Sequence, residues 1–199
     1  FFLYYGLHQP HVPRAPHQRF VGTTTMGPRG DAIVEADWCV GELISHLDKE
    51  GLLENTIIIF SSDNGPVVND GYKDMSPELL GKHKPTGGLR GGKYSLFDGG
   101  THVPFFVYWK GNVEPMVSDA MVCHMDIMAS LAGMLSVDLP DGLDSECHID
   151  ALLGRSSEAR KSLVIEAQGR LAYRYEDWAM LPPYKGSRKN LTGNELGNL

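Results

Sequence analysis

The chain has 199 residues, of which 42% are hydrophobic and 22% are charged. This composition is that of a globular protein and excludes a collagen, a coiled-coil rod and a disordered tail. Its 18 basic and 25 acidic residues give a formal net charge of -7, which argues against nucleic-acid binding through a basic face. No apolar stretch reaches the roughly 18 residues that a membrane-spanning helix needs, so we expect no membrane span.

The first predicted element is a strand at residues 1–8, where the apolar run FFLYYGLH is typical of a buried strand. Since a protein seldom begins inside a strand, we expect the sequence to be a fragment of a longer one. The prolines of residues 8–16 forbid a helix and hold the backbone extended. Apolar residues at steps of three and four then predict a helix over 31–49, and Gly51 marks its end.

The second half of the chain alternates strands and helices. The apolar, β-branched run at 56–61 is typical of strands buried on both faces of a parallel sheet, and a similar run lies at 103–109. Residues 64–92 contain no predicted element. The later predicted elements are a helix over 126–135, with Asp126 as its N-cap, and strands at 162–167 and 171–175. This order predicts an α/β fold with a mostly parallel central sheet flanked by helices.

Polar residues follow the predicted strand at 56–61, and ligands of open α/β sheets bind beyond the carboxyl ends of strands. Asp63 and Asn64 offer two hard oxygen ligands, which suit Ca²⁺ or Mg²⁺ better than Zn²⁺. The alternative is an Asp-Asn-Gly turn, which the same residues favour for backbone reasons. Two oxygens also leave most of a metal's coordination shell to be supplied from elsewhere.

Two basic residues are further candidates. Lys93 follows two glycines, which let the backbone approach a ligand while the ammonium meets an anion. The alternative is a solvated surface lysine. His11 lies in a stiff loop between prolines, where an imidazole binds an oxyanion or protonates a leaving group near neutral pH. The other loop histidines compete with it: His8, His17, His83 and His102.

Three ordered segments closely resemble the sulfatase family of the alkaline-phosphatase superfamily: LHQPHVP at 7–13, NTIIIFSSDNG at 55–65 and GLRGGKYSLFDGGTHVPFFVYWKG at 88–111. The likeness extends over nearly the whole chain. It implies an arylsulfatase-like enzyme with an alkaline-phosphatase-like fold. Residues 1–170 would be the later part of the catalytic α/β domain, and 171–199 the beginning of a smaller C-terminal subdomain.

The resemblance implies roles for individual residues. Asp63 and Asn64 match the family's second pair of calcium ligands, so Ca²⁺ is the expected metal and Mg²⁺ fits less well. Lys93 matches the lysine that binds a sulfate oxygen. His11 matches the histidine that contacts the sulfate and helps to protonate the departing alcohol. The implied substrate is a small sulfated molecule such as a sulfated glycan.

The loop before the lysine motif is where this family often meets its substrate, and it contains His83 and Lys84. After the lysine the family usually has E-G-G-x-R-x-P, whereas this chain has Asp98 in place of Glu and His102 in place of Arg. Asp has a shorter reach than Glu, and His lacks the bidentate donor of Arg. We expect both changes to tune activity rather than abolish it.

The resemblance also implies two parts that this sequence lacks. Sulfatases carry a C/S-x-P/A-S-R signature whose Cys or Ser becomes the formylglycine nucleophile, and none of Cys39, Cys123 and Cys147 stands in it. The family's first calcium-binding Asp pair is missing too. We expect both upstream of residue 1, so that the fragment alone is inactive.

Two alternatives stay open. One is a phosphodiesterase or phosphonate hydrolase of the same superfamily, although SSDNG lacks the DHG form that many of those enzymes share. The other is a non-catalytic sulfoglycan-binding protein that has lost the nucleophile. Because calcium-dependent sulfatases usually act outside the cytosol, the resemblance implies the periplasm, the extracellular space or the lysosome.

Overall fold

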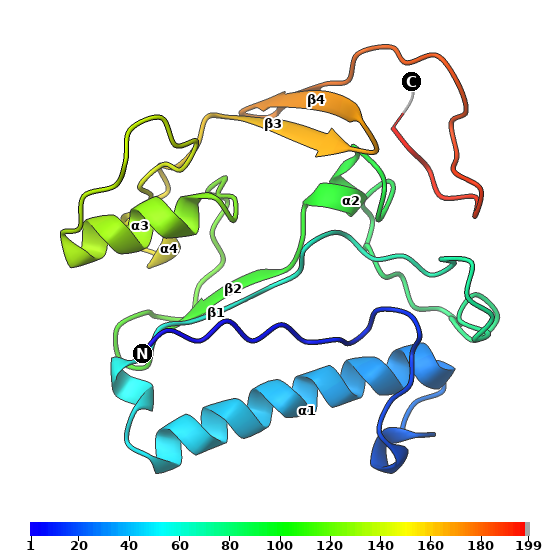
Figure 1. Ribbon diagram of the computed structural model, residues 1–199, viewed down its shortest axis with the longest axis horizontal. Helices are drawn as coiled ribbons and strands as arrows, with labels where there is room; N and C mark the ends of the chain where they lie inside the picture. The colour runs from blue at the N-terminus through cyan, green and yellow to red at the C-terminus, as the bar shows by residue number, and fades with distance from the viewer. Residues whose placement is uncertain (198–199) are drawn as a thin grey trace.

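The computed structural model describes residues 1–197 (Figure 1). Its helices are α1 (Gly27–Lys49), α2 (Asp98–Thr101), α3 (Asp126–Leu135) and α4 (Ile149–Leu152), with 3-10 turns η1 (Gln18–Phe20) and η2 (Leu53–Asn55). Its strands are β1 (Ile58–Ser61), β2 (Phe105–Tyr108), β3 (Ser162–Ala167), β4 (Arg170–Tyr175) and β5 (Trp178–Met180). No helix of this described part is both long and apolar enough to cross a membrane.

The predicted helices and most of the predicted strands are present. The helix predicted over 31–49 is α1, which begins four residues earlier because Pro28 fits the first turn of a helix, where no intrahelical donor is needed. The helix predicted over 126–135 is α3, with the same bounds. The four strands predicted after residue 50 correspond to β1 through β4. The segment between β1 and α2 has no helix or strand, as predicted.

The prediction of a mostly parallel sheet is wrong for the described residues, where both sheets are antiparallel. β1 pairs with β2, and β3, β4 and β5 form a second sheet in that order. The chain leaves β1 at Ser61 and returns at Phe105, which lies directly opposite Ser61 in the register. A parallel partner would have to cross back to the start of β1, usually over a helix. An apolar run indicates a buried strand but does not determine whether its neighbour in the sheet runs parallel or antiparallel to it.

The strand predicted at residues 1–8 is also wrong, since this segment is extended but pairs with no strand of the described chain. Phe1, Phe2 and Tyr4 are each more than 80% exposed. An apolar run favours a strand only where a neighbour satisfies its backbone N–H and C=O groups. The segment instead approaches α1, where a hydrogen bond between Tyr5 and Cys39 raises the pKa of the phenol.

The elements that the sequence did not predict are short. α2 and α4 have four residues each and β5 has three, too few to show a periodic pattern. β3 and β4 form a hairpin that pairs Ala167 with Arg170, so the expected domain boundary at residue 170 falls at the start of β4. Figure 1 shows α2 between this sheet and the β1–β2 pair, with α1 along the lower edge of the view.

Candidate active site

The segment that follows β1 is packed so closely against α2 that residue 65 must be glycine. The backbone N–H of Gly65 donates to the carbonyl of Gly100 over 2.8 Å. A Cβ on Gly65 would lie 1.8 Å from the carbonyl oxygen of Gly99, far inside van der Waals contact. Glycine permits this close approach because it has no side chain. The contact fixes the place of Asp63 and Asn64, which immediately precede it.

The turn that carries Lys93 is held to the same segment. Its backbone N–H donates to the carbonyl of Pro66 over 3.0 Å. A Cβ on Gly92 would lie 2.6 Å from that carbonyl oxygen, so a second glycine is needed here. The double glycine that made Lys93 a candidate therefore serves close packing between two backbone segments.

These contacts bring three of the predicted site residues to one open cleft of about 470 Å³. Asp63, Asn64 and Lys93 all line it. Its other walls come from residues 123–125, before and at the start of α3, and from residues 163–168 of β3 and the following turn. Asp63 is exposed, and the side chain of Lys93 is 16% exposed. The cleft thus places a carboxylate, a carboxamide and an ammonium group along one surface.

His11 does not line the cleft but contacts Lys93, which does. Its Nε2 lies 3.3 Å from the Lys93 Nζ, and its Nδ1 lies 2.7 Å from the carbonyl oxygen of Val12. A carbonyl only accepts and an ammonium only donates, so the proton belongs on Nδ1 and Nε2 is the acceptor. The structure therefore brings together the lysine and the histidine, which are 82 residues apart in sequence.

A buried arginine fixes the loop that carries His11. The Arg14 guanidinium donates to the Asp74 carboxylate (2.7 Å), the Ser76 hydroxyl (2.9 Å) and the Val67 carbonyl (3.1 Å). The Arg14 and Asp74 side chains are only 3% and 5% exposed. Burial alone raises the pKa of Asp74, but hydrogen bonds from Ser76 and Arg14 outweigh it and hold the pKa below its usual range. Two loops distant in sequence are thereby joined beside the cleft.

Asp70 is a site residue that the sequence analysis did not find. Its Oδ2 lies 3.5 Å from the Lys93 Nζ, and its Oδ1 accepts a 2.5 Å hydrogen bond from the Tyr94 hydroxyl. This bond raises the pKa of Tyr94 to about 12. Burial alone raises the pKa of Asp70, but the bonds from Tyr94 and Lys93 leave it lowered. In the sequence, Asn69-Asp70-Gly71 is typical of an ordinary turn, so nothing marked Asp70 as a candidate site residue.

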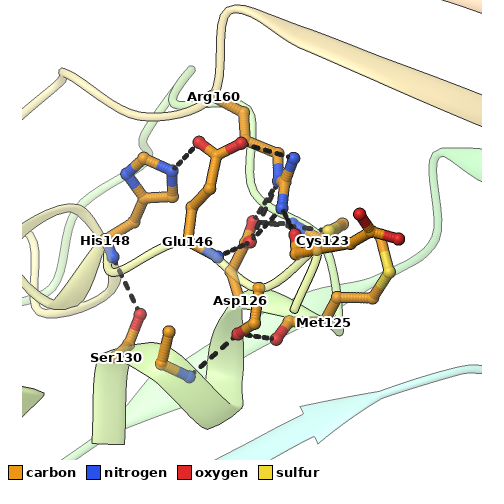
Figure 2. Close-up of polar contacts among 10 residues, drawn as sticks. Cys123, Met125, Asp126, Ser130, Glu146, His148 and Arg160 are labelled. Atoms are coloured by element: carbon orange, nitrogen blue, oxygen red, sulfur yellow. Dashed lines mark hydrogen bonds and ion pairs between the residues drawn. The ribbon is translucent and has the colours of Figure 1, made fainter. Parts of the chain in front are cut away.

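The wall at residues 123–125 is anchored by the charge cluster in Figure 2, formed by the buried Asp126 and Arg160 and by the exposed Glu146. Arg160 Nη2 and Nε donate to Asp126 over 2.7 and 2.9 Å, and Nη1 donates to Glu146 over 2.7 Å. The Asp126 side chain is completely buried, and that of Arg160 is 8% exposed. The expected N-cap role of Asp126 is therefore wrong: Met125 is the N-cap, and Asp126 is the first helical residue.

The cluster supports the segment at 123–125 that lines the cleft. The Asp126 carboxylate accepts from the Cys123 backbone N–H over 3.0 Å, and burial raises the pKa of the Cys123 thiol. His124 Nε2 lies 2.8 Å from the Ser61 hydroxyl, which donates to the Pro104 carbonyl over 2.8 Å. This wall is therefore tied to β1 through His124 and to the segment before β3 through Arg160.

The remaining predicted residues do not line the cleft. His83 and Lys84 are exposed in a turn and are not among the residues that line it. Asp98, which stands in place of the usual glutamate, forms an ion pair with Arg174 of β4. His102 is the C-cap of α2. Of the two departures from the family pattern, Asp98 thus lies in a contact between elements and His102 lies at the end of a helix.

The metal ligands implied by the resemblance are present as a pair. Asn64 donates its Nδ2 to the carbonyl of Gly65 over 3.0 Å, and no hydrogen bond within the described residues uses its Oδ1. That oxygen and the exposed Asp63 carboxylate are donors of the kind that calcium prefers. Within residues 1–197, no group of three or more His, Cys, Asp and Glu side chains gathers for a metal. The pair fits a hard cation but forms only part of a coordination shell.

Comparison with known proteins identifies the family. Residues 1–137 match the family described as Sulfatase. The chain belongs to the sulfatase family. It is therefore related to sulfuric ester hydrolases, and the recognition drawn from the three sequence segments is confirmed.

Individual relatives agree with this assignment. The chain is 43% identical over 202 residues to an N-acetylgalactosamine-6-O-sulfatase of Bacteroides thetaiotaomicron, covering 100% of this chain and 40% of that protein. It is 34% identical over 167 residues to arylsulfatase A of Homo sapiens, covering 82% of this chain and 31% of that protein. The chain thus spans less than half the length of these relatives.

Solved structures show the same fold. One, described with the metabolism of multiple glycosaminoglycans by Bacteroides thetaiotaomicron, matches with a TM-score of 0.96 at 43% identity over 100% of this chain and 42% of that one. The PsFucS1 sulfatase from Pseudoalteromonas sp. matches with a TM-score of 0.77 at 27% identity, over 96% of this chain and 38% of the other. The described residues therefore have the fold of the corresponding part of a sulfatase.

Proposed function

We propose that the whole protein to which this chain belongs hydrolyses sulfate esters, and that this chain supplies the groups that hold the sulfate. The observation that carries the proposal is the contact of Lys93 with His11 beside the cleft that Asp63 and Asn64 line. Membership of the sulfatase family supports the same reaction.

The two basic residues would act on different oxygens. Cleavage of the S–O bond places negative charge on the non-bridging oxygens and on the departing alcohol oxygen. A fixed ammonium at Lys93 would stabilise the charge on the non-bridging oxygens, since preorganised charges act most strongly where charge develops. His11, with its Nδ1 proton held by Val12, would take up a proton from solvent on Nε2 and give that proton to the departing alcohol oxygen as the S–O bond breaks.

Asp63 and Asn64 would hold a calcium ion together with ligands from outside the described residues. Mg²⁺ fits less well because it demands a near-octahedral shell and gives up its waters reluctantly. When bound, such a cation supplies positive charge close to the reacting oxygens. The formylglycine nucleophile would also come from outside this chain, so we expect residues 1–199 alone to be inactive.

The substrate that the relatives favour is a sulfated sugar. One of them is named an N-acetylgalactosamine-6-O-sulfatase, and the structure with the TM-score of 0.96 is described with the metabolism of glycosaminoglycans. We propose a sulfated amino sugar of this kind as the substrate class. The polar groups along the cleft suit the hydroxyls of a sugar.

The experiment that tests this function is a crystal structure of the whole protein grown with calcium chloride and sodium sulfate. We expect a cation bound by Asp63 and Asn64, and a sulfate with oxygens within hydrogen-bond distance of the Lys93 Nζ and the His11 Nε2. A sulfate bound elsewhere, with the Lys93 side chain still directed only at Asp70, would contradict the proposal.

A further inference from the structure

A carboxylate beside a lysine that binds sulfate is unexpected, because it repels the anion. Asp70 nevertheless lies against Lys93, and its side chain is only 11% exposed. Both of its oxygens are in use: Oδ1 accepts from Tyr94, and Oδ2 faces the Lys93 ammonium. A carboxylate with both oxygens engaged by its neighbours is suited to holding those neighbours in place.

The backbone at residue 70 is itself fixed from both sides. Before it, Asn69 donates its Nδ2 to the Thr192 carbonyl over 3.3 Å, and its own carbonyl accepts from Asn194 over 2.8 Å. After it, Asp74 is held by the buried Arg14. Asp70 is thus carried on a segment anchored to the turn that holds Thr192 and Asn194 on one side and to the His11 loop on the other.

The conformation of Tyr94 completes the arrangement. Successive side chains of an extended backbone point to opposite sides, so Lys93 and Tyr94 would not normally reach one carboxylate. Tyr94 has a φ of 79°, in the left-handed region that a non-glycine residue rarely adopts. This turn of the chain lets both neighbours contact Asp70, and unusual backbone of this kind is concentrated at functional sites.

We propose that Asp70 is a positioning residue that directs the Lys93 ammonium toward the sulfate group, with Tyr94 as its second support. The inference rests on the proposed function and adds a residue to it. Without Asp70, the polar partner that remains to the flexible four-carbon stem of Lys93 among the described residues is His11. The ammonium then samples orientations that do not meet the sulfate oxygens.

The opposite reading, in which Asp70 acts only as a nearby negative charge, predicts effects of opposite sign. Removing a repelling charge would tighten the binding of sulfate and speed the reaction. Removing a positioning group weakens sulfate binding and slows the reaction, but only while Lys93 is present. The sign of the change and its dependence on Lys93 therefore separate the two.

The test is a double-mutant cycle in the whole protein with 4-nitrophenyl sulfate as substrate. Asp70→Asn keeps an acceptor for the Tyr94 hydroxyl and removes the charge. We expect it to lower kcat/KM about tenfold, in keeping with the loss of one charge-assisted hydrogen bond. In a Lys93→Ala background the same substitution is expected to change kcat/KM by less than about twofold, because residues that act through one another are not additive. Asp70→Glu, which retains the charge, should recover part of the loss.

The matched control is Asp48→Asn, which removes one of the two acidic partners that Lys110 has among the described residues, in an exposed ion pair of 2.9 Å whose residues do not line the cleft. It is expected to leave kcat/KM unchanged. Equal losses from Asp70→Asn in both backgrounds, or a gain in the wild-type background, would overturn the inference.

Calorimetric titration with inorganic sulfate separates this inference from the proposed function. We expect Asp70→Asn to bind sulfate several-fold more weakly than the unsubstituted protein, whether or not the protein hydrolyses the ester. Tighter or unchanged binding overturns the role of Asp70. Absence of hydrolysis by the unsubstituted protein contradicts the proposed function while leaving the titration to decide on Asp70.

Discussion

The two walls of the cleft are held in place by different physical means. On the side of Asp63 and Lys93, backbone segments touch directly, and glycines at 65 and 92 make the contact possible. On the side of residues 123–125, a buried arginine and a buried aspartate form a charge cluster. On the first wall the Asp63 carboxylate is exposed and no hydrogen bond within the described residues uses the Asn64 Oδ1, whereas the charged groups of the second wall are engaged in internal bonds.

This difference teaches how a site keeps polar groups available. On the binding side, backbone contacts and the buried Arg14–Asp74 ion pair hold the segments together, so the side chains that would bind a ligand are not needed for this. Charges that only support the structure can be buried and paired, which makes them sensitive to loss of a partner. Substitutions on the two walls should therefore fail in different ways.

The largest effect on stability is expected on the wall at residues 123–125, which the Asp126–Arg160 pair holds. Asp126→Ala leaves Arg160 buried without its main partner, and breaking a buried pair in this way costs about 3–5 kcal/mol. The free energy of unfolding, measured by urea denaturation of the whole protein, reports the loss. The double variant Asp126→Ala, Arg160→Met should regain much of it, because no buried unpaired charge then remains and Glu146 is exposed to water. A loss below about 1 kcal/mol for the single variant would show that the cluster does not hold this wall.

A smaller effect on stability, together with weaker metal binding, is expected on the wall that carries Asp63 and Lys93. Gly65→Ala places a methyl group against the Gly99 carbonyl and forces the two segments apart, which costs about 1–3 kcal/mol. Because Asp63 and Asn64 move with this segment, calcium binding measured by calorimetry should weaken as well.

The matched control for this prediction is Gly41→Ala in α1, where an added Cβ meets nothing within 4 Å. Alanine favours a helix more than glycine does, so this variant should gain about 0.5–1 kcal/mol in stability. If Gly65→Ala were as well tolerated as Gly41→Ala, close backbone approach would not be what positions the site.

Local patterns in the sequence predicted most of the helices and strands and several of the residues beside the cleft, but not the direction of strand pairing. The apolar spacing over 126–135 gave the bounds of α3, and the strand ending before Asp63 was placed within two residues of β1. Lys93 and His11 were selected from the glycines and prolines beside them, and the structure puts their side chains in contact. These signals are local, since each depends on a few neighbouring residues.

What the sequence did not predict depends on partners far along the chain. Asp126 has the position of an N-cap, but Arg160, 34 residues later, draws its carboxylate into a buried pair. Asp70 is typical of a turn residue in the sequence, and only the structure shows its contacts with Lys93 and Tyr94. The apolar run of β1 indicated burial, whereas the direction of its partner was set by where the chain returned at Phe105.

The most direct test of the central claim is the turnover number of Lys93→Ala in the whole protein on 4-nitrophenyl sulfate, compared with Lys110→Ala, which removes an exposed lysine away from the cleft. Loss of one group that stabilises developing charge lowers kcat by on the order of 10²–10³, and we predict a loss of this size for Lys93→Ala with the thermal unfolding midpoint preserved. We predict no change for Lys110→Ala. A kcat for Lys93→Ala equal to that of the unsubstituted protein would contradict the assignment of this cleft to sulfate ester hydrolysis.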